Sequence, residues 1–298
     1  MRVVSLLPST TEILFAIGAG DDVVGVTFEC DHPVEARERR IVSTSALPEG
    51  LSPREIDAFV RAARHAGEDL YRLDAGALEG LDADLVVTQD LCAVCAVDVS
   101  VVQDALSHLG TRAEVLTIDP HTLAEVLGSV LTLGRATGRE APAEALVQRL
   151  EERLQRVRDE VAERRRAGAR TPRMLVLEWT DPAFTPGHWV PEMVELAGAT
   201  CTLGQAGATS VRADWSQVRA SAPDVVVCAP CGYDLPAALE LARELVGSGE
   251  LPPDVPVWAV DANASFARPG PRLVDGVETL AAIVAGADPH GNAACRVR

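Results

Sequence analysis

The chain has 298 residues, of which 47% are hydrophobic and 24% charged. This is ordinary globular composition, and the length suits two domains of roughly 120–150 residues each. The formal net charge is −17, and all 27 basic residues are arginine. Such an acidic surface disfavours nucleic acid and anionic lipid as partners. No apolar stretch reaches the roughly 18 residues of a membrane span, so we expect no membrane insertion.

The amino terminus predicts a strand, a loop and a helix rather than a secretion signal. The first apolar run, Val3–Leu7, is cut after five residues by Pro8, whereas a signal needs about 7–15 apolar residues. Ser9 and Glu12 have the spacing of a capping box, which predicts a helix over residues 13–17. We therefore expect a cytoplasmic protein. The odd number of cysteines, seven, agrees with reduced thiols in that compartment.

Short apolar runs alternate with helical segments, which is typical of parallel βαβ units. The predicted strands are residues 2–7, 23–27, 85–88, 115–118 and 173–178. The predicted helices include residues 52–65, 99–109, 122–137, 141–166 and 273–284. The expected fold class is thus α/β, with two Rossmann-like lobes that contain parallel sheets and are joined by a long rigid helix.

The pattern divides the chain into four segments. We predict an N-terminal α/β lobe at 1–120, a bridging helical segment at 121–170, a C-terminal α/β lobe at 171–290 and a disordered tail at 291–298. The two lobes resemble each other in sequence: DLVVTQDLC at 84–92 is similar to DVVVCAPC at 224–231. Ligands of open parallel sheets bind beyond the carboxyl ends of the strands, so we expect the loops that follow the strands to converge on a cleft between the lobes.

Four cysteines follow predicted strand ends: Cys30, Cys92, Cys95 and Cys231. Thiolates with the Cys-x-x-Cys spacing of Cys92 and Cys95 can bind one metal ion or form a redox pair. All four together could hold zinc or an iron–sulfur cluster. The alternative is that they are small apolar side chains in tight loops, the reading we favour for Cys228 within its strand.

Residues 178–192 form the stretch with the highest density of functional groups. It contributes a carboxylate, two indoles, a phenyl ring and an imidazole, namely Glu178, Trp179, Trp189, Phe184 and His188. The indoles could stack on a flat ligand, although either one could instead fill a packing site. We add Tyr233, Phe266 and Arg268 as candidate ligand contacts, because a position before a helix amino terminus suits the binding of a carboxylate or phosphate.

Several stretches carry a family resemblance. RVVSLLPSTTEILFAIG at 2–18, VGV at 24–26 and DHP at 31–33 resemble the cobalamin-binding proteins, which belong to the helical-backbone (class III) substrate-binding family of ABC importers. DPAFTPG at 181–187 and FARPGPR at 266–272 are similar to that family's second-lobe loops. The resemblance covers about residues 1–285 and implies two lobes, one rigid helix, a shallow ligand cleft and little closure.

The resemblance favours a cytoplasmic binding protein for cobalamin or a related metal chelate. In the family, aromatic side chains pack on the corrin, but the matching first-lobe loops here show Cys30, Ala46 and residues 89–95. The alternative is therefore a protein that holds a metal or iron–sulfur cluster on cysteines and performs chemistry on a small molecule. A third reading is an importer component whose export signal precedes this sequence. We expect a monomer or small homo-oligomer.

Overall fold

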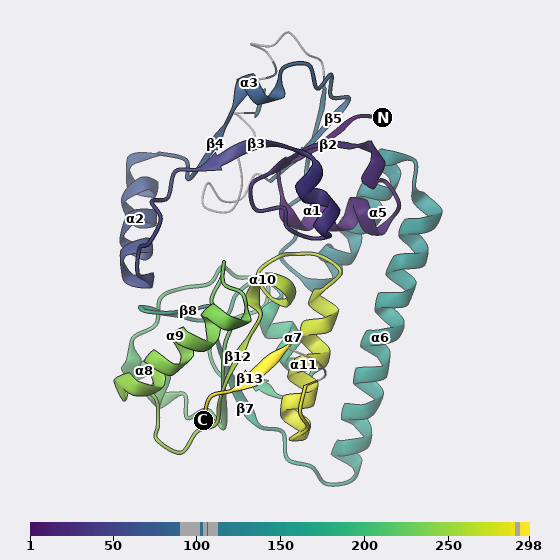
Figure 1. Ribbon diagram of the computed structural model, residues 1–298. Helices are drawn as coiled ribbons and strands as arrows, with labels where there is room; N and C mark the ends of the chain where they lie inside the picture. Colours follow the sequence, from purple (N-terminus) through teal and green to yellow (C-terminus); the bar gives the residue numbers. More distant parts are fainter. Residues whose placement is uncertain (90–101, 104–105, 107–112, 290–292) are drawn as a thin grey trace. The chain divides into compact units, whose positions relative to one another are not determined.

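The computed structural model describes residues 1–89, 102–103, 106, 113–289 and 293–298 (Figure 1). The chain divides into two compact units. Unit 1 comprises residues 1–119 and 127–147, and unit 2 comprises residues 120–126 and 148–298. Each unit is α/β with a mainly parallel sheet, which confirms the predicted fold class. The limits 1–120, 121–170 and 171–290 remain a prediction.

The sheet of unit 1 has the strand order β4-β3-β2-β1-β5-β6. Strand β4 runs antiparallel to β3, and the other neighbouring pairs are parallel. The strands are β1 (Val3–Ser5), β2 (Val23–Thr27), β3 (Arg40–Ser45), β4 (Tyr71–Leu73), β5 (Leu85–Thr88) and β6 (Glu114–Thr117). Their buried residues pack with those of the neighbouring helices into a core that includes Val4, Leu6, Val42 and Val86.

Short helices connect the strands of unit 1. They are α1 (Pro8–Ala16), α2 (Pro53–Ala66), α3 (Ala75–Leu78) and the 3-10 turns η1 (Gly20–Asp22) and η2 (Val34–Glu38). Ser52 caps α2 by accepting a hydrogen bond from the Glu55 nitrogen, and the Glu55 carboxylate accepts one from the Ser52 nitrogen. This reciprocal cap confirms the start of the helix predicted at 52–65.

Helix α1 corrects one prediction. It begins at Pro8, and Leu7 rather than Ser9 is its N-cap. Proline is suited to the first helical position because its φ angle is already helical and its nitrogen needs no partner. The threonine side chains of the first turn bond with the preceding loop. The Thr10 hydroxyl donates to the Leu7 carbonyl at 3.1 Å, and the Thr11 hydroxyl donates to the Ser5 hydroxyl at 2.8 Å. The capping box predicted at Ser9 and Glu12 was wrong.

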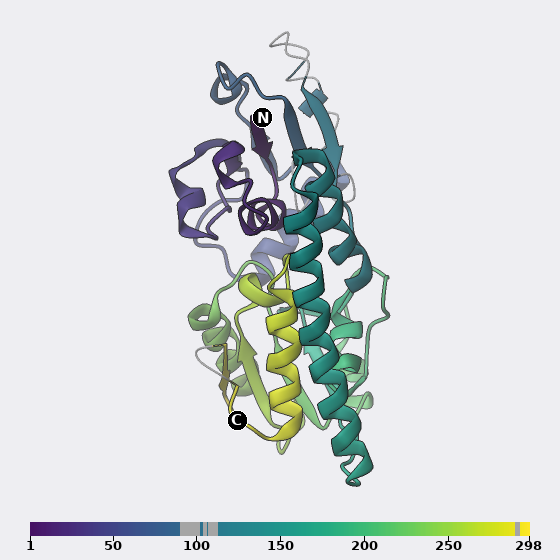
Figure 2. The same ribbon diagram turned by 90° about the vertical axis from the view of Figure 1, so that its right-hand side faces the viewer.

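Two helices contain residues of both units. They are α5 (Leu123–Thr137) and the long α6 (Glu140–Arg166), which appears in teal in Figure 2. Within unit 2, Arg153 of α6 bonds two carboxylates of α11 (Leu273–Ala285): Asp275 at 2.5 Å and Glu278 at 2.6 Å. These charge-assisted bonds hold α11 against α6.

The sheet of unit 2 has the order β10-β7-β11-β12-β13. The strands are β7 (Arg173–Leu177), β10 (Thr200–Cys201), β11 (Val225–Cys228), β12 (Val257–Val260) and β13 (Ala294–Arg296), with a separate hairpin of β8 (Trp179–Thr180) and β9 (Ala183–Phe184). The helices besides α11 are α7 (Val190–Leu196), α8 (Trp215–Ala220), α9 (Leu235–Ser248) and α10 (Ala262–Ser265). The order β10-β7-β11-β12 repeats β2-β1-β5-β6 of unit 1, in agreement with the internal sequence similarity.

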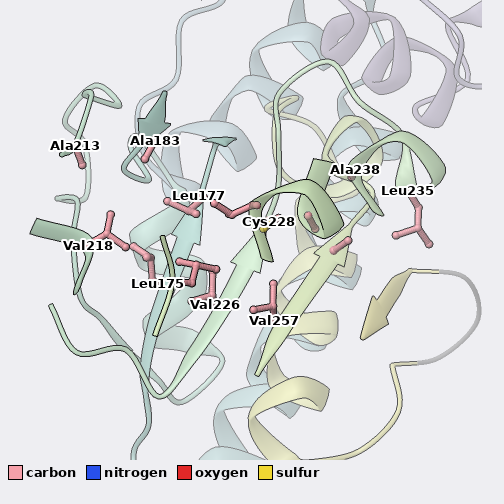
Figure 3. Close-up of a cluster of buried hydrophobic side chains, with 14 residues drawn as sticks. Leu175, Leu177, Ala183, Ala213, Val218, Val226, Cys228, Leu235, Ala238 and Val257 are labelled. Atoms are coloured by element: carbon pink, nitrogen blue, oxygen red, sulfur yellow. The ribbon is translucent and has the colours of Figure 1, made fainter. Parts of the chain in front are cut away.

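One core cluster of unit 2 lies between its sheet and the helices α8 and α9. Figure 3 shows side chains from β7 and β11, such as Leu175, Leu177 and Val226, packed with Leu235 and Ala238 of α9. Cys228 lies among them without exposed surface, and burial raises the pKa of its thiol to about 12. Its interpretation as a core residue is confirmed.

The carboxyl terminus corrects a second prediction. Strand β13 pairs antiparallel with β12, and the Val297 nitrogen donates to the Val257 carbonyl at 2.8 Å. The Arg298 guanidinium donates to the Pro252 carbonyl at 2.7 Å. The prediction of a disordered tail at 291–298 is therefore wrong for residues 293–298, because the edge of β12 supplies backbone partners to a short polar segment. Within the described residues, no helix is both long and apolar enough to cross a membrane.

Candidate ligand-binding site

Most of the candidate ligand residues lie on loops at one edge of the unit 2 sheet. Strands β7, β11 and β12 are parallel, so their carboxyl ends share an edge. Glu178 follows β7, Tyr233 follows β11, and Phe266 and Arg268 follow β12. Two hydrogen bonds tie these loops together: the Cys231 nitrogen donates to the Glu178 carbonyl at 3.0 Å, and the Asn263 nitrogen donates to the Tyr233 carbonyl at 3.2 Å.

Trp179 and Tyr233 form an aromatic pair at this edge. Their ring centroids are 5.6 Å apart with planes tilted by 58°, a favourable arrangement for two aromatic rings. Both side chains are partly exposed. The Trp179 indole nitrogen donates to the Asp181 carbonyl at 3.1 Å, which fixes the indole orientation. Burial raises the pKa of the Tyr233 hydroxyl, so that this group remains neutral.

Phe184 adds a third ring through the β8–β9 hairpin. Trp179 and Phe184 are directly opposite in the antiparallel register, and such partners project to the same face of a hairpin. Phe184 is also bridged to Arg212 on its other side. The hairpin thus presents two partly exposed rings, of which Trp179 contacts Tyr233.

Glu178 connects β7 to the loop that contains residues 186–188. Its carboxylate accepts a hydrogen bond from the Gly187 nitrogen at 2.8 Å and another from the Ser210 hydroxyl. Removal of water by burial raises the pKa of Glu178 to about 7, against the lowering effect of these two bonds. A carboxyl group at the site can therefore gain or lose a proton near neutral pH.

His188 has a left-handed backbone, with φ of 48°. Its nitrogen donates to the Ala208 carbonyl at 2.6 Å, and its carbonyl accepts from the Gly207 nitrogen at 2.9 Å. The imidazole lies between two rings, with centroid distances of 5.7 Å to His121 and 5.5 Å to Trp189. Sequence reasoning placed His188 at the site but did not predict His121 as its neighbour.

Trp189 and Phe266 occupy the interior instead of the surface. Only 8% of Trp189 and 2% of Phe266 is exposed. The Trp189 indole nitrogen donates to the Phe266 carbonyl at 2.7 Å, which fastens the loop after β12 to the start of α7. Trp189 is therefore the indole that fills a packing site, the alternative that the sequence left open. Ligand contact by either ring remains a prediction, which this burial does not favour. Arg268 is partly exposed on the same loop, ahead of α11.

The cysteine hypothesis finds no support in the described residues. Cys92 and Cys95 lie outside them. Cys30, in unit 1, is 3% exposed, and its sulfur lies 3.1 Å from the Thr11 hydroxyl. Cys231, in unit 2, is exposed. Within the part of the chain that the structure describes, no three His, Cys, Asp or Glu side chains are grouped so that they could hold a metal ion.

Unit 1 contains an aromatic pair that sequence reasoning missed. Phe28 directly follows β2 and is 37% exposed, and its ring centroid lies 5.6 Å from that of Tyr71. Tyr71 pairs with Ser45, the last residue of β3, so both rings lie at the carboxyl edge of the sheet. The Tyr71 hydroxyl donates to the Glu29 carboxylate at 2.6 Å. The sequence signal that could have indicated this pair is the small number of tyrosines. The chain has only two, and each is in such an aromatic pair.

Comparison with known proteins agrees with this architecture. The sequence profile of the family described as "Periplasmic binding protein" matches residues 3–243. The chain belongs to this family. A relative from Bacillus subtilis (strain 168), described as the uncharacterized ABC transporter substrate-binding lipoprotein YvrC, is 25% identical over 94% of this chain and 78% of its own length.

Two solved structures show the same periplasmic binding protein fold. A periplasmic heme-binding protein from Pseudomonas aeruginosa has a TM-score of 0.72 and 21% identity, covering 99% of this chain and 97% of that one. The periplasmic vitamin B12-binding protein BtuF of Vibrio cholerae has a TM-score of 0.67 and 21% identity, covering 95% of this chain and 96% of that one. The family resemblance inferred from the amino-terminal motif is confirmed.

Proposed function

We propose that this member of the family is the ligand-binding component of an ABC-type transport system, and that its ligand is cobalamin or a related metal chelate. The observation that carries the proposal is the aromatic pair at the carboxyl edge of each sheet: Trp179 with Tyr233 in unit 2, and Phe28 with Tyr71 in unit 1. The family membership and the names of the B12-binding and heme-binding neighbours support it.

The physical reason is that large planar macrocycles bind through the faces of aromatic rings. Trp179, Tyr233 and Phe28 have exposed surface, whereas Tyr71 is only 9% exposed and supports Phe28 from inside. Rings held in tilted pairs offer apolar surface that is already ordered, so little conformational entropy is lost on binding. The chain has eleven aromatic residues, as five Phe, four Trp and two Tyr. Five of these residues, namely the four members of the two pairs and Phe184, lie at the sheet edges where ligands of α/β proteins bind. This concentration favours a dedicated ring-binding function.

Polar groups beside the rings suit the rim of such a ligand. Glu178 and the Tyr233 hydroxyl accompany the unit 2 pair, while Glu29 accompanies the unit 1 pair. A corrin bears amide groups that can donate to carboxylates, whereas a heme bears carboxylates that carboxylates repel. The two carboxyl groups favour cobalamin over heme, whereas Arg268 on the loop after β12 is a candidate contact that would suit a carboxylate.

The test is a titration of the purified chain with hydroxocobalamin and, separately, with hemin, followed by absorption and tryptophan fluorescence. We expect saturable binding of one cobalamin and weaker binding of hemin. Trp179→Ala and Tyr233→Ala should each weaken cobalamin binding about tenfold or more, as for buried aromatic contacts at other interfaces.

Trp215→Ala is the matched control, because it removes another partly exposed indole of unit 2, on helix α8. Circular dichroism should show that all three variants remain folded. Absence of binding to both macrocycles would contradict the proposal. Equal weakening by Trp215→Ala would show that the aromatic pair is not the binding surface.

A further inference from the structure

Two imidazoles meet in unit 2 although neither belongs to the aromatic pairs. The ring centroids of His121 and His188 are 5.7 Å apart, and the ring planes are inclined by 36°. Both side chains are partly exposed. His121 lies on the segment 120–126, which belongs to unit 2, so the pair lies within one compact unit.

Backbone interactions hold His188 in an uncommon conformation. Its φ of 48° is in the left-handed region, which few residues other than glycine adopt. Bonds with the backbone of Ala208 and Gly207 fix this turn. The preceding residue, Gly187, packs closely against the backbone of residues 208–210, since a Cβ at Gly187 would lie 2.3 Å from the Ser210 nitrogen. Residues kept in such conformations are concentrated at functional sites.

Carboxylates surround the segment that contains His121. Glu125 accepts hydrogen bonds from the His121 nitrogen at 2.6 Å and the Thr122 nitrogen at 3.1 Å. Glu192 of α7 accepts one from the Leu123 nitrogen at 2.8 Å. The Glu125 and Glu192 carboxylates thus bring acidic groups to the segment of His121, which favours a cation nearby.

The distance between the rings fits one shared metal ion. With metal–nitrogen bonds of about 2.0–2.1 Å, two imidazoles on one ion have centroids roughly 4.5 Å apart at a right angle and roughly 6.4 Å apart when opposite. The observed 5.7 Å lies between these limits. We propose that His121 and His188 form a two-imidazole site for a divalent transition-metal ion of the zinc, nickel or copper class, with water completing the coordination.

This site is independent of the proposed chelate function. It needs no macrocycle, and its ligands are neutral imidazole nitrogens, which zinc, nickel and copper prefer to calcium or magnesium. Two protein ligands leave coordination positions open, so the bound ion can also accept a ligand from solution.

The test is a calorimetric titration of the full chain with Ni²⁺, with tryptophan fluorescence recorded in parallel. Trp189 reports on the site because its ring lies 5.5 Å from that of His188. We expect saturable binding with a change in fluorescence. His121→Ala and His188→Asn should each weaken it by at least about tenfold, since even outer-shell changes cost that much in metal sites. Asparagine is chosen because it tolerates the left-handed backbone.

His65→Ala is the control, because it removes an exposed imidazole from the last turn of α2 in unit 1. Every variant retains the same thiols, so a difference between them isolates the imidazoles. Unchanged Ni²⁺ affinity in both His121→Ala and His188→Asn would overturn the proposal, as would the absence of binding by the unmodified chain. Mg²⁺ should produce no fluorescence change.

Discussion

The carboxylate of Glu178 accepts a hydrogen bond of 2.8 Å from the backbone nitrogen of Gly187. This contact connects the end of strand β7 to the loop that places His188 and the start of α7. A titratable group thus holds the backbone of the candidate site, and its protonation state is coupled to the stability of the fold.

Glu178 should make stability decrease as the pH rises. Burial raises its pKa from 4.5 to about 7. Between these values the folded chain binds a proton that the unfolded chain has released, so the free energy of unfolding falls as pH increases. The contribution is complete below about pH 4.5 and lost above about pH 7, and it amounts to at most about 3 kcal/mol.

Glu178→Gln removes this titration and keeps an acceptor for the Gly187 nitrogen. We expect the variant to gain stability relative to the unmodified chain between pH 5 and pH 8, measured by urea unfolding at both values. Glu195→Gln, an exposed position on α7, is the control and should show no such gain. A stability difference between Glu178→Gln and the unmodified chain that is the same at both pH values would contradict the prediction.

Gly187→Ala should destabilise unit 2. The added Cβ would lie 2.3 Å from the Ser210 nitrogen and 2.8 Å from the Ala208 carbonyl oxygen, and backbone atoms cannot move aside. We expect a loss of about 1–3 kcal/mol in urea unfolding. Gly128→Ala in α5 meets no atom within 4 Å and should stabilise the chain by about 1 kcal/mol. If both substitutions changed the free energy of unfolding equally, close packing would not explain why glycine is required at position 187.

Trp189→Phe tests the packing role of the buried indole. Phenylalanine keeps most of the apolar contact but loses the 2.7 Å bond to the Phe266 carbonyl. Leaving that carbonyl without its partner should lower the free energy of unfolding by about 1–3 kcal/mol. Trp215→Phe at a partly exposed position should cost much less. Equal losses in the two variants would argue against the hydrogen bond as the cause.

A cytoplasmic location remains a prediction from the sequence. Fractionation of the native host, with an antibody against the chain, tests this expectation, which cannot hold together with the transport role proposed above. Recovery with the soluble cytoplasmic proteins would support the expectation and contradict that role. Recovery at the cell surface would contradict that expectation and would agree with the description of the Bacillus subtilis relative as a lipoprotein.

Much of the architecture follows from local sequence. Strands β2 and β5 lie at the predicted residues 23–27 and 85–88, and α6 covers the predicted helix at 141–166 with one residue more. The two strands are short apolar runs that are almost wholly buried, and α6 has apolar residues at helical spacing. The motif at residues 2–18 also identified the family, because the order and spacing of its residues are specific.

Only the tertiary structure decided which side chains meet. Pairing of Trp179 with Tyr233, of Phe28 with Tyr71 and of His121 with His188 depends on loops that are distant in the chain. The same holds for Trp189, whose indole looked available for a ligand but donates to a buried carbonyl. Sequence periodicity predicts which face of its own helix or strand a residue lies on. Contacts between loops arise only when parallel strands bring their carboxyl ends to one edge of the sheet.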